Sequence, residues 1–184
     1  MALKATIFKA SLQIADMDRN VYADHGLTIA RHPSETDERM MIRVLAFALL
    51  VPADDKNGTL ELAKGLSDTD EPDLWHRDLT GRIVHWVDTG QPDDKRLMKA
   101  SGRVDRVTVF SYSASTPIWW SGIATKITRA SNIEVLQVPA AQSQELAGLA
   151  QRTMQLQVSI QDGTVWVSDA KHSVELSPLR LNPA

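Results

Sequence analysis

The sequence contains no cysteine among its 184 residues. Disulfide bonds, thiol catalysis and thiolate zinc sites are therefore excluded. It also lacks a run of about eighteen consecutive apolar residues, the length expected of a membrane-spanning helix. The N-terminal segment MALKATIF has neither the long apolar core nor the small-residue cleavage site of a signal peptide. These absences predict a cytoplasmic protein without a membrane segment.

Signatures of common ligand sites are missing as well. The chain has no G-x-G-x-x-G sequence and no phosphate-binding P-loop, so a nucleotide cofactor is not expected. The five histidines show no ligand spacing and are interpreted as structural. A formal net charge of −3 excludes a protein that coats nucleic acid through a broad basic face. An enzyme that touches only a few phosphates remains compatible with that charge.

Composition and pattern indicate an ordinary globular protein of the α/β class. Hydrophobic residues make up 43% of the chain and charged residues 23%, and there is no internal repeat or long linker. We therefore expect residues 1–184 to form one domain. Strand and helix patterns alternate along its middle, which predicts a mixed sheet flanked by helices.

The expected elements begin with a β-hairpin formed by residues 6–16 and 22–31. A helix over 35–50 follows, capped by Ser34, and its second half is apolar around most of its circumference, so it should be buried. A second helix opens with Pro92 at its first position and closes at Gly102. The other expected strands lie at 60–65, 73–77, 82–87, 104–112, 133–138, on both sides of an Asp162-Gly163 turn, and at 172–176, with further helices from Thr116-Pro117 and over 142–151.

Two carboxylates at strand ends are the first candidate site. Asp73 opens the 73–77 strand and Asp88 follows the 82–87 strand, so pairing of these strands would bring the two together. Two unit charges 4 Å apart repel by about 4 kcal/mol at an effective dielectric of 20. Either a cation lies between them or one carboxylate takes a proton. Mg²⁺ suits such oxygen ligands, and Mn²⁺ is a substitute. Alternatively, Asp73 caps a turn and Asp88 caps the helix that begins at Pro92.

Further candidates flank this pair. Lys95 and Lys99 are four residues apart and so share one helix face, from which either could orient a water or stabilise charge on a phosphate. The alternative is a solvated stripe. Glu38 stands at the end of an apolar helical stripe, as a site residue or as a rim residue paired with a neighbour. Gln91 either orients a water or caps the following helix.

Three segments together carry a resemblance to a known family. They are SETDER at 34–39, EPDLW at 71–75, and HWVDTGQP at 85–92 running into KRLMKAS at 95–101. On these segments the chain resembles the YaeQ family over essentially its whole length. It is also similar to the PD-(D/E)xK phosphodiesterase superfamily, which has the restriction-endonuclease-like fold. The resemblance implies a core of helix, three strands, helix and strand, with an N-terminal β-hairpin and C-terminal strands forming a mixed sheet.

The resemblance also implies roles for individual residues. Asp73 matches the first metal-binding aspartate, Asp88 the (D/E) position, and Glu38 the acid that some members supply from the first helix. The superfamily lysine is expected two residues after Asp88, where this chain has Gly90. Lys95 or Lys99 from the next helix is expected to replace it.

Two functions are compatible with these residues. The first is a Mg²⁺-dependent phosphodiesterase acting on DNA or RNA, with Asp73, Asp88 and Glu38 as metal ligands and a lysine at the phosphate. The second is a relative that has kept the fold and lost catalysis, and that binds nucleic acid or a protein partner as a regulatory module. The displaced lysine and the mildly acidic charge favour the second, whereas the retained acids favour the first.

Overall fold

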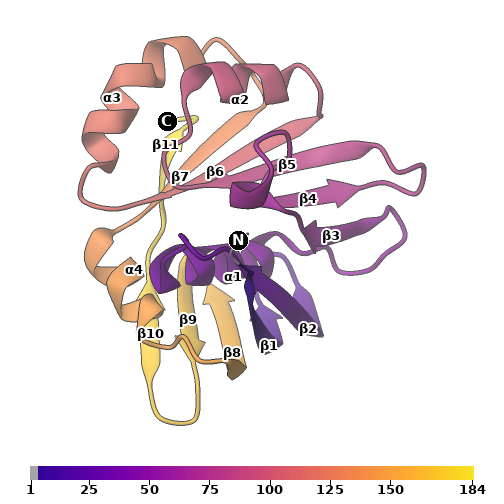
Figure 1. The fold of residues 1–184 in the computed structure, drawn as a ribbon, viewed down its shortest axis with the longest axis vertical. Coiled ribbons are helices and arrows are strands. Elements are labelled where there is room, and N and C mark those ends of the chain that lie inside the picture. Colours follow the sequence, from indigo (N-terminus) through magenta and orange to yellow (C-terminus); the bar gives the residue numbers. More distant parts are fainter. Residues whose placement is uncertain (1–3) are drawn as a thin grey trace.

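A computed structural model describes residues 4–184, so the first three residues of the expected domain lie outside the described part. Within it, eleven strands form two mixed sheets, and four α-helices pack against them (Figure 1). The α/β class predicted from the alternating pattern is confirmed. None of the helices in residues 4–184 is both long and apolar enough to cross a lipid bilayer.

The five-stranded sheet joins the two ends of the chain. Its strands are β1 (Thr6–Asp16), β2 (Val21–Arg31), β8 (Thr153–Gln161), β9 (Thr164–Ser168) and β10 (Ser173–Leu176), in the order β10-β9-β8-β1-β2. β1 runs parallel to β8, and the other pairs are antiparallel. Alternate residues of β1 and β8 are buried, as a sheet with one covered face requires.

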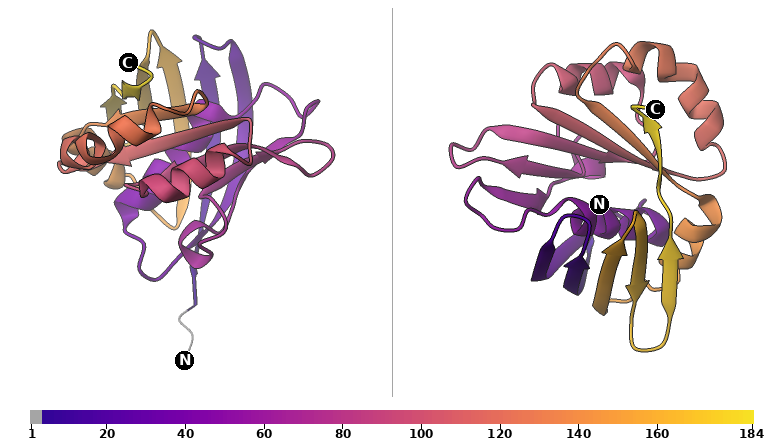
Figure 2. Two further views of the ribbon diagram at one scale, coloured as in Figure 1. Left: turned by 90° about the horizontal axis from the view of Figure 1, so that it is seen from above. Right: turned by 180° about the vertical axis from the view of Figure 1, so that it is seen from behind.

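The six-stranded sheet contains the middle of the chain. Its strands are β3 (Thr59–Leu62), β4 (Leu74–Arg77), β5 (Ile83–Thr89), β6 (Arg106–Tyr112), β7 (Ile133–Val138) and β11 (Leu179–Asn182), in the order β11-β7-β6-β5-β4-β3. β5, β6 and β7 are parallel and are connected through α2 (Asp94–Ser101) and α3 (Thr116–Ile127). Such crossovers place both helices against one face of the sheet, as Figure 2 shows.

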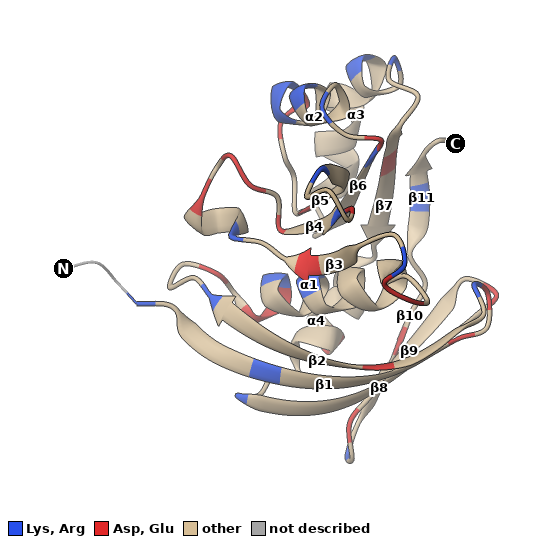
Figure 3. Cartoon of the chain, turned by 90° about the vertical axis from the view of Figure 1, so that its right-hand side faces the viewer, with Lys and Arg blue, Asp and Glu red and all other residues tan. Residues whose placement is uncertain are grey.

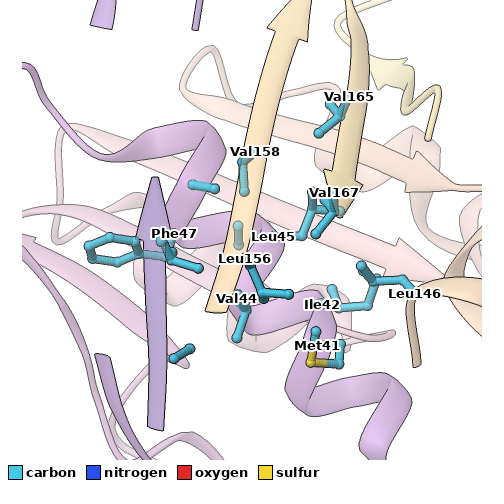
Figure 4. Packing of buried hydrophobic residues seen from close by; sticks show 14 of the residues in the cluster. Met41, Ile42, Val44, Leu45, Phe47, Leu146, Leu156, Val158, Val165 and Val167 are labelled. Carbon is cyan, nitrogen blue, oxygen red and sulfur yellow. The ribbon is translucent and has the colours of Figure 1, made fainter. Parts of the chain in front are cut away.

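Helix α1 (Asp37–Leu50) lies between the two sheets and forms the centre of the main core (Figures 1 and 2). Every residue from Met40 to Ala48 is buried. Val44 and Leu45 pack near side chains of β8 and β9, among them Leu156 and Val167 (Figure 4), whereas Phe47 contacts the His25 ring of β2. Helix α4 (Ala140–Ala147) packs beside α1. A helix that is apolar on all sides needs cover on all sides.

That requirement explains where the expected architecture was wrong. We expected one mixed sheet, but the N-terminal hairpin and β8–β10 form a separate sheet on the far side of α1. β11 was not expected and completes the six-stranded sheet beside β7. One sheet can cover only one side of a helix, so the all-round burial of α1 calls for two.

Two helix starts also differ from expectation. α1 begins at Asp37, where the Thr36 side chain accepts a hydrogen bond from the Arg39 N–H at 3.1 Å, so Thr36 and not Ser34 is the cap. α2 begins at Asp94 with Asp93 as its cap, whose carboxylate accepts from the Arg96 N–H at 2.7 Å. Pro92 therefore precedes the helix. In both places a nearer side chain reaches the free N–H groups of the first turn.

We expect Thr36→Ala to lower the free energy of unfolding by about 1 kcal/mol, because the first turn of α1 loses its side-chain cap. Ser34→Ala is the matched control. Its hydroxyl contacts the exposed His32 ring and not the helix, so the loss should be well below that of Thr36→Ala. Urea denaturation of both variants measures the difference, and equal losses would contradict the assignment of the cap.

Candidate functional site

A cavity of about 310 Å³ opens where β5 ends and the chain turns toward α2. Its wall comes from the first turns of α1, from the loop before β4 and from the β5–α2 connection. The lining residues are Arg39, Gly65, Leu66, Thr69, Asp73, Asp88, Thr89, Gly90, Gln91, Pro92 and Arg96. We call this cavity the acid pocket, because two buried carboxylates lie in its wall.

Asp73 is held by three donors. Its side chain is buried and accepts from Arg39 Nη2 at 2.7 Å, from the Thr89 N–H at 2.8 Å and from Thr89 Oγ1 at 2.9 Å. Gly65 makes room for it: the backbone there has φ +49°, and a Cβ would lie 2.2 Å from Asp73 Oδ1. A side chain at position 65 is therefore incompatible with the carboxylate in this position.

Asp88 is held by one bidentate partner. Arg96 donates from Nε to Oδ2 at 2.8 Å and from Nη2 to Oδ1 at 3.2 Å. The same guanidinium donates to the carbonyl oxygens of Glu71 at 2.9 Å and Thr69 at 2.5 Å, so it ties α2 to the loop before β4. Burial raises the pKa of Asp88 above its ordinary value, although the hydrogen bonds and charge of Arg96 oppose that rise.

Arg39, in the first turn of α1, connects the pocket to the segment just before that helix. Its Nη1 donates to Glu35 Oε2 at 2.5 Å while its Nη2 holds Asp73. Arg43 binds the same Glu35 carboxylate, through Nε at 3.0 Å and through Nη2 at 2.5 Å. Burial works against the charge on Arg39, but the carboxylates of Asp73 and Glu35 outweigh it and raise its pKa. Acids and arginines thus alternate through the interior from Arg43 to Asp73.

The structure brings three of the six predicted site residues together. Asp73, Asp88 and Gln91 line the acid pocket. Gln91 Nε2 donates to the hydroxyls of Ser113 and Ser115, at 2.9 and 2.7 Å. The proposed capping role of Asp88 is wrong, because Asp93 caps α2.

The other three lie elsewhere. Glu38 does not line the acid pocket, and its carboxylate accepts from Ser143 Oγ of α4 at 3.1 Å. Lys95 and Lys99 line a neighbouring cavity of about 270 Å³, which lies between α2, Trp86 of β5 and the loop at Thr69 and Asp70. α2 begins at Asp94, two residues later than expected, and Arg96 rather than either lysine faces the carboxylates.

The neighbouring cavity is lined by four basic side chains and by two acidic ones, Asp70 and Asp93. We call Lys95, Arg96, Lys99 and Arg103 the α2 basic cluster; all four line this cavity, beside Trp86, and Figure 3 shows the blue segments of α2. The guanidinium carbons of Arg96 and Arg103 lie 5.3 and 5.8 Å from the centre of the Trp86 ring, a cation–π geometry. Lys95, Lys99 and Arg103 form no ion pair within residues 4–184. Arg96 lines both cavities.

The arrangement around the carboxylates does not fit a divalent metal ion. Each of the four carboxylate oxygens of Asp73 and Asp88 already accepts a hydrogen bond, and two guanidinium groups stand beside them. Among residues 4–184 no group of three or more His, Cys, Asp or Glu side chains is placed to hold a metal. Arg39 and Arg96 already compensate the charge of both carboxylates, and their two guanidinium groups would repel a cation placed beside them. The metal remains a prediction from the resemblance.

Sequence reasoning missed Arg39 and Arg96, the two cations of the acid pocket. Arg39 has a signal in the sequence, because it follows Glu35 by four residues, the spacing of an ion pair on one helix face. Arg96 has no such signal, since its contact with Asp88 depends on how α2 is rotated against the sheet. The superfamily pattern predicts a lysine at this place, which favours Lys95 and Lys99 over the arginine.

Comparisons with known proteins agree on one family. A family model described as YaeQ protein matches residues 1–178. YaeQ of Salmonella typhi is 44% identical over 177 residues, covering 96% of this chain and 95% of the relative. YaeQ of Escherichia coli (strain K12) is 43% identical over 178 residues, covering 96% of both.

Two crystal structures have the same architecture. The YaeQ protein of Xanthomonas axonopodis pv. citri superposes with a TM-score of 0.90 at 47% identity, over 96% of this chain and 98% of that one. The YaeQ protein of Pseudomonas syringae also gives 0.90, at 36% identity, over 98% of this chain and 97% of that one. The two mixed sheets and four helices described above match these structures.

Proposed function

This chain belongs to the YaeQ family, and on that premise we propose that it is a nuclease-like protein that binds the phosphate backbone of nucleic acid without cleaving it. The proposal is supported by the order helix, three strands, helix and strand in the middle of the chain, which is the order that the resemblance implies. In this proposal the α2 basic cluster binds phosphate, and the acid pocket serves as a fixed support for Arg96.

One observation carries the proposal: each acid of the expected catalytic pair is already neutralised by an arginine. Arg39 compensates Asp73 and Arg96 compensates Asp88. The superfamily pattern predicts a lysine beside the acids. In this chain α2 supplies an arginine there, Arg96, which binds the Asp88 carboxylate directly. A guanidinium group holds a carboxylate through two parallel bonds and remains charged at any physiological pH.

Phosphate binding is supported by the three unpaired cations of the neighbouring cavity. Lys95, Lys99 and Arg103 project from one helix and the turn after it, and no carboxylate within residues 4–184 pairs with them. Cations without an acidic partner are free to replace the counterions of a phosphate backbone, which is the main source of affinity for nucleic acid. A small cluster on a chain of net charge −3 predicts weak binding that salt readily removes.

A metal-dependent phosphodiesterase is the second candidate. It is favoured by the position of Asp73, Asp88 and Gln91 around one cavity. It would require both guanidinium groups to leave the carboxylates. The two candidates therefore differ in a measurable way, because only the second predicts that a divalent ion stabilises the protein through Asp73 and Asp88.

Binding is tested by fluorescence anisotropy with labelled single-stranded RNA, single-stranded DNA and duplex DNA over a range of salt concentrations. We expect the triple substitution Lys95→Ala, Lys99→Ala and Arg103→Ala to weaken binding and to reduce the slope of log K against log salt by about 2–3 for duplex DNA. The matched control removes the same charge elsewhere, with Lys9, Lys56 and Lys171 replaced by alanine. Equal losses in both triple variants would contradict a site at α2.

Metal binding is tested by thermal melting with millimolar Mg²⁺ or Mn²⁺, and cleavage by incubation with the same nucleic acids. We expect no shift of the melting temperature and no cleavage. A rise of roughly 5–11 °C, the range for a site saturated about 100-fold over its Kd, would favour the second candidate. The proposal would be overturned if Asp73→Ala and Asp88→Ala abolished this metal-induced rise in melting temperature and the unmodified protein cleaved nucleic acid.

A further inference from the structure

β2 is an edge strand with little of the usual protection against pairing; only at Thr28 and Ala30 does its edge line a cavity, of about 340 Å³, with Arg43 and β3. It stands last in the five-stranded sheet and pairs with β1 over all eleven residues without a bulge (Figure 1). Its sequence, VYADHGLTIAR, contains neither proline nor lysine. The opposite edge, β10, is only four residues long. Natural edge strands are usually short, bulged or blocked by lysine or proline, because a long regular edge is a template for another strand.

The register shows which backbone groups of β2 point outward. The Lys9 N–H donates to the Arg152 carbonyl at 2.8 Å, on the β8 side of β1. The backbone N–H and C=O groups of Lys9 therefore point away from β2. Lys9 and its partner Thr28 form a non-hydrogen-bonded pair. The backbone N–H and C=O groups of Thr28 point away from β1, toward the open edge of the sheet. The same holds for every second residue of β2, namely Tyr22, Asp24, Gly26 and Ala30. The Ala30 carbonyl accepts from Arg43 at 3.4 Å on that outer side, which agrees with this alternation and leaves one lone pair free.

We propose that two copies of this chain associate through β2, antiparallel and about a two-fold axis, with Gly26 of one copy opposite Gly26 of the other. β2 runs from Val21 to Arg31, and Gly26 is its central residue. This register therefore pairs all eleven residues of each strand, and Gly26 exchanges both of its hydrogen bonds with its counterpart. The two five-stranded sheets become one continuous sheet of ten strands.

The side chains of β2 are complementary in this register. Tyr22 meets Ala30, a large side chain opposite a small one, and Asp24 meets Thr28. On the core side His25 meets Leu27. No like charges stand opposite each other, and nothing within 4 Å covers the Cβ direction of Gly26 at the centre. A shift that brings Asp24 opposite Asp24 shortens the ladder and places two carboxylates side by side, which is unfavourable.

A second copy suits this edge better than an unrelated peptide for a geometric reason. In a two-fold interface the same strand is used on both copies, so the side chains of its first half must be complementary to those of its second half. β2 meets that condition over its full length. A foreign extended segment would need only the backbone groups, and the self-matching of Asp24 with Thr28 and of Tyr22 with Ala30 would have no role.

The test is sedimentation velocity of the full chain over a range of concentrations. We expect a monomer–dimer equilibrium. Thr28→Asp should weaken it by roughly 5- to 10-fold, because each dimer gains two opposed pairs of carboxylates, Asp24 against the new aspartate. The change should not harm the monomer, since Thr28 faces Lys9 on β1. Adding Asp24→Lys to Thr28→Asp restores opposite charges and should restore the dimer.

Amide hydrogen exchange by NMR gives a second readout that depends on register. The N–H groups of Tyr22, Asp24, Gly26, Thr28 and Ala30 should become protected as concentration rises, whereas those of the odd-numbered residues should be protected at all concentrations by β1. A protein that is monomeric at every concentration overturns the proposal. So does a dimer that Thr28→Asp leaves unchanged, or protection at another surface. None of these outcomes bears on nucleic-acid binding at α2, so the two proposals fail separately.

Discussion

Replacing Arg96 with methionine should lower the free energy of unfolding by about 3 kcal/mol at neutral pH, near the lower end for breaking a buried ion pair. The Asp88 carboxylate is 3% exposed and has Arg96 as its charged partner. Without the guanidinium it is a buried charge without compensation. Arg96 itself is 27% exposed, which moderates the loss. Methionine retains the apolar stem, so packing changes little.

The loss should depend on pH with a definite sign. Burial raises the pKa of Asp88 in the folded protein, whereas in the unfolded chain an aspartate has a pKa of about 3.9. The folded state therefore holds this proton more tightly, and the stability linked to Asp88 falls as pH rises through the window between the two pKa values. Removing Arg96 raises the folded pKa further and extends that window upward. The substitution Arg96→Met should thus be least destabilising in acid and most destabilising above the pKa that Asp88 has in the folded variant.

Urea denaturation between pH 4 and pH 8 measures this profile, and Asp88→Asn combined with Arg96→Met is its control. The double variant has no carboxylate at position 88 that could be left without a charged partner. It should therefore regain much of the stability lost by Arg96→Met and should lose the added pH dependence. A variant whose stability loss is the same at every pH would show that Arg96 stabilises only through its bonds to the loop carbonyls.

Replacing Glu35 with glutamine is expected to have the largest effect on stability, a loss of about 3–5 kcal/mol. The Glu35 carboxylate is 1% exposed and binds both Arg39 and Arg43. Arg39 would keep Asp73 as a partner. Arg43, at 6% exposure, would be left with only the Ala30 carbonyl. A buried guanidinium group without a carboxylate is the main cost.

Glu38→Gln is the matched control for this variant. Glu38 lies in the first turn of α1, three residues after Glu35, but it is only partly buried and its carboxylate accepts one hydrogen bond, from Ser143. We expect a loss of about 1 kcal/mol or less. Thermal and urea denaturation of both variants measure the contrast. Similar losses would contradict the view that the interior network begins at Glu35, and would return Glu38 to the candidates for a central role.

These variants also bear on the proposed function. Both arginines of the acid pocket are fixed by structural contacts before any ligand arrives, Arg39 through Glu35 and Arg96 through the carbonyls of the loop before β4. Arginines held in this way support the carboxylates and position the basic face of α2. If the variants lose stability as expected, the pocket is poorly suited to release its cations for a metal ion.

Much of the fold was predictable because its signals are local. The alternation of β1, the turn at Asp162-Gly163 and the closing of α2 at Gly102 each depend on a few neighbouring residues. The family resemblance likewise placed Asp73 and Asp88 on adjoining strands, and they do line one cavity. The number of sheets was not predictable in this way, because whether the hairpin joins the middle strands or pairs with β8 depends on partners more than a hundred residues away.

The sequence by itself determined the class of the fold, the identity and order of most of its elements, and the position of two acids at the ends of neighbouring strands. Those properties follow from periodicity and turn chemistry, which act over a few residues. Only the tertiary structure decided that α1 lies between two sheets, that Arg39 and Arg96 hold the acids, and that the lysines of α2 face another cavity. Which cation reaches a buried carboxylate depends on the rotation of a helix against a sheet, and that rotation is set by packing across the whole core.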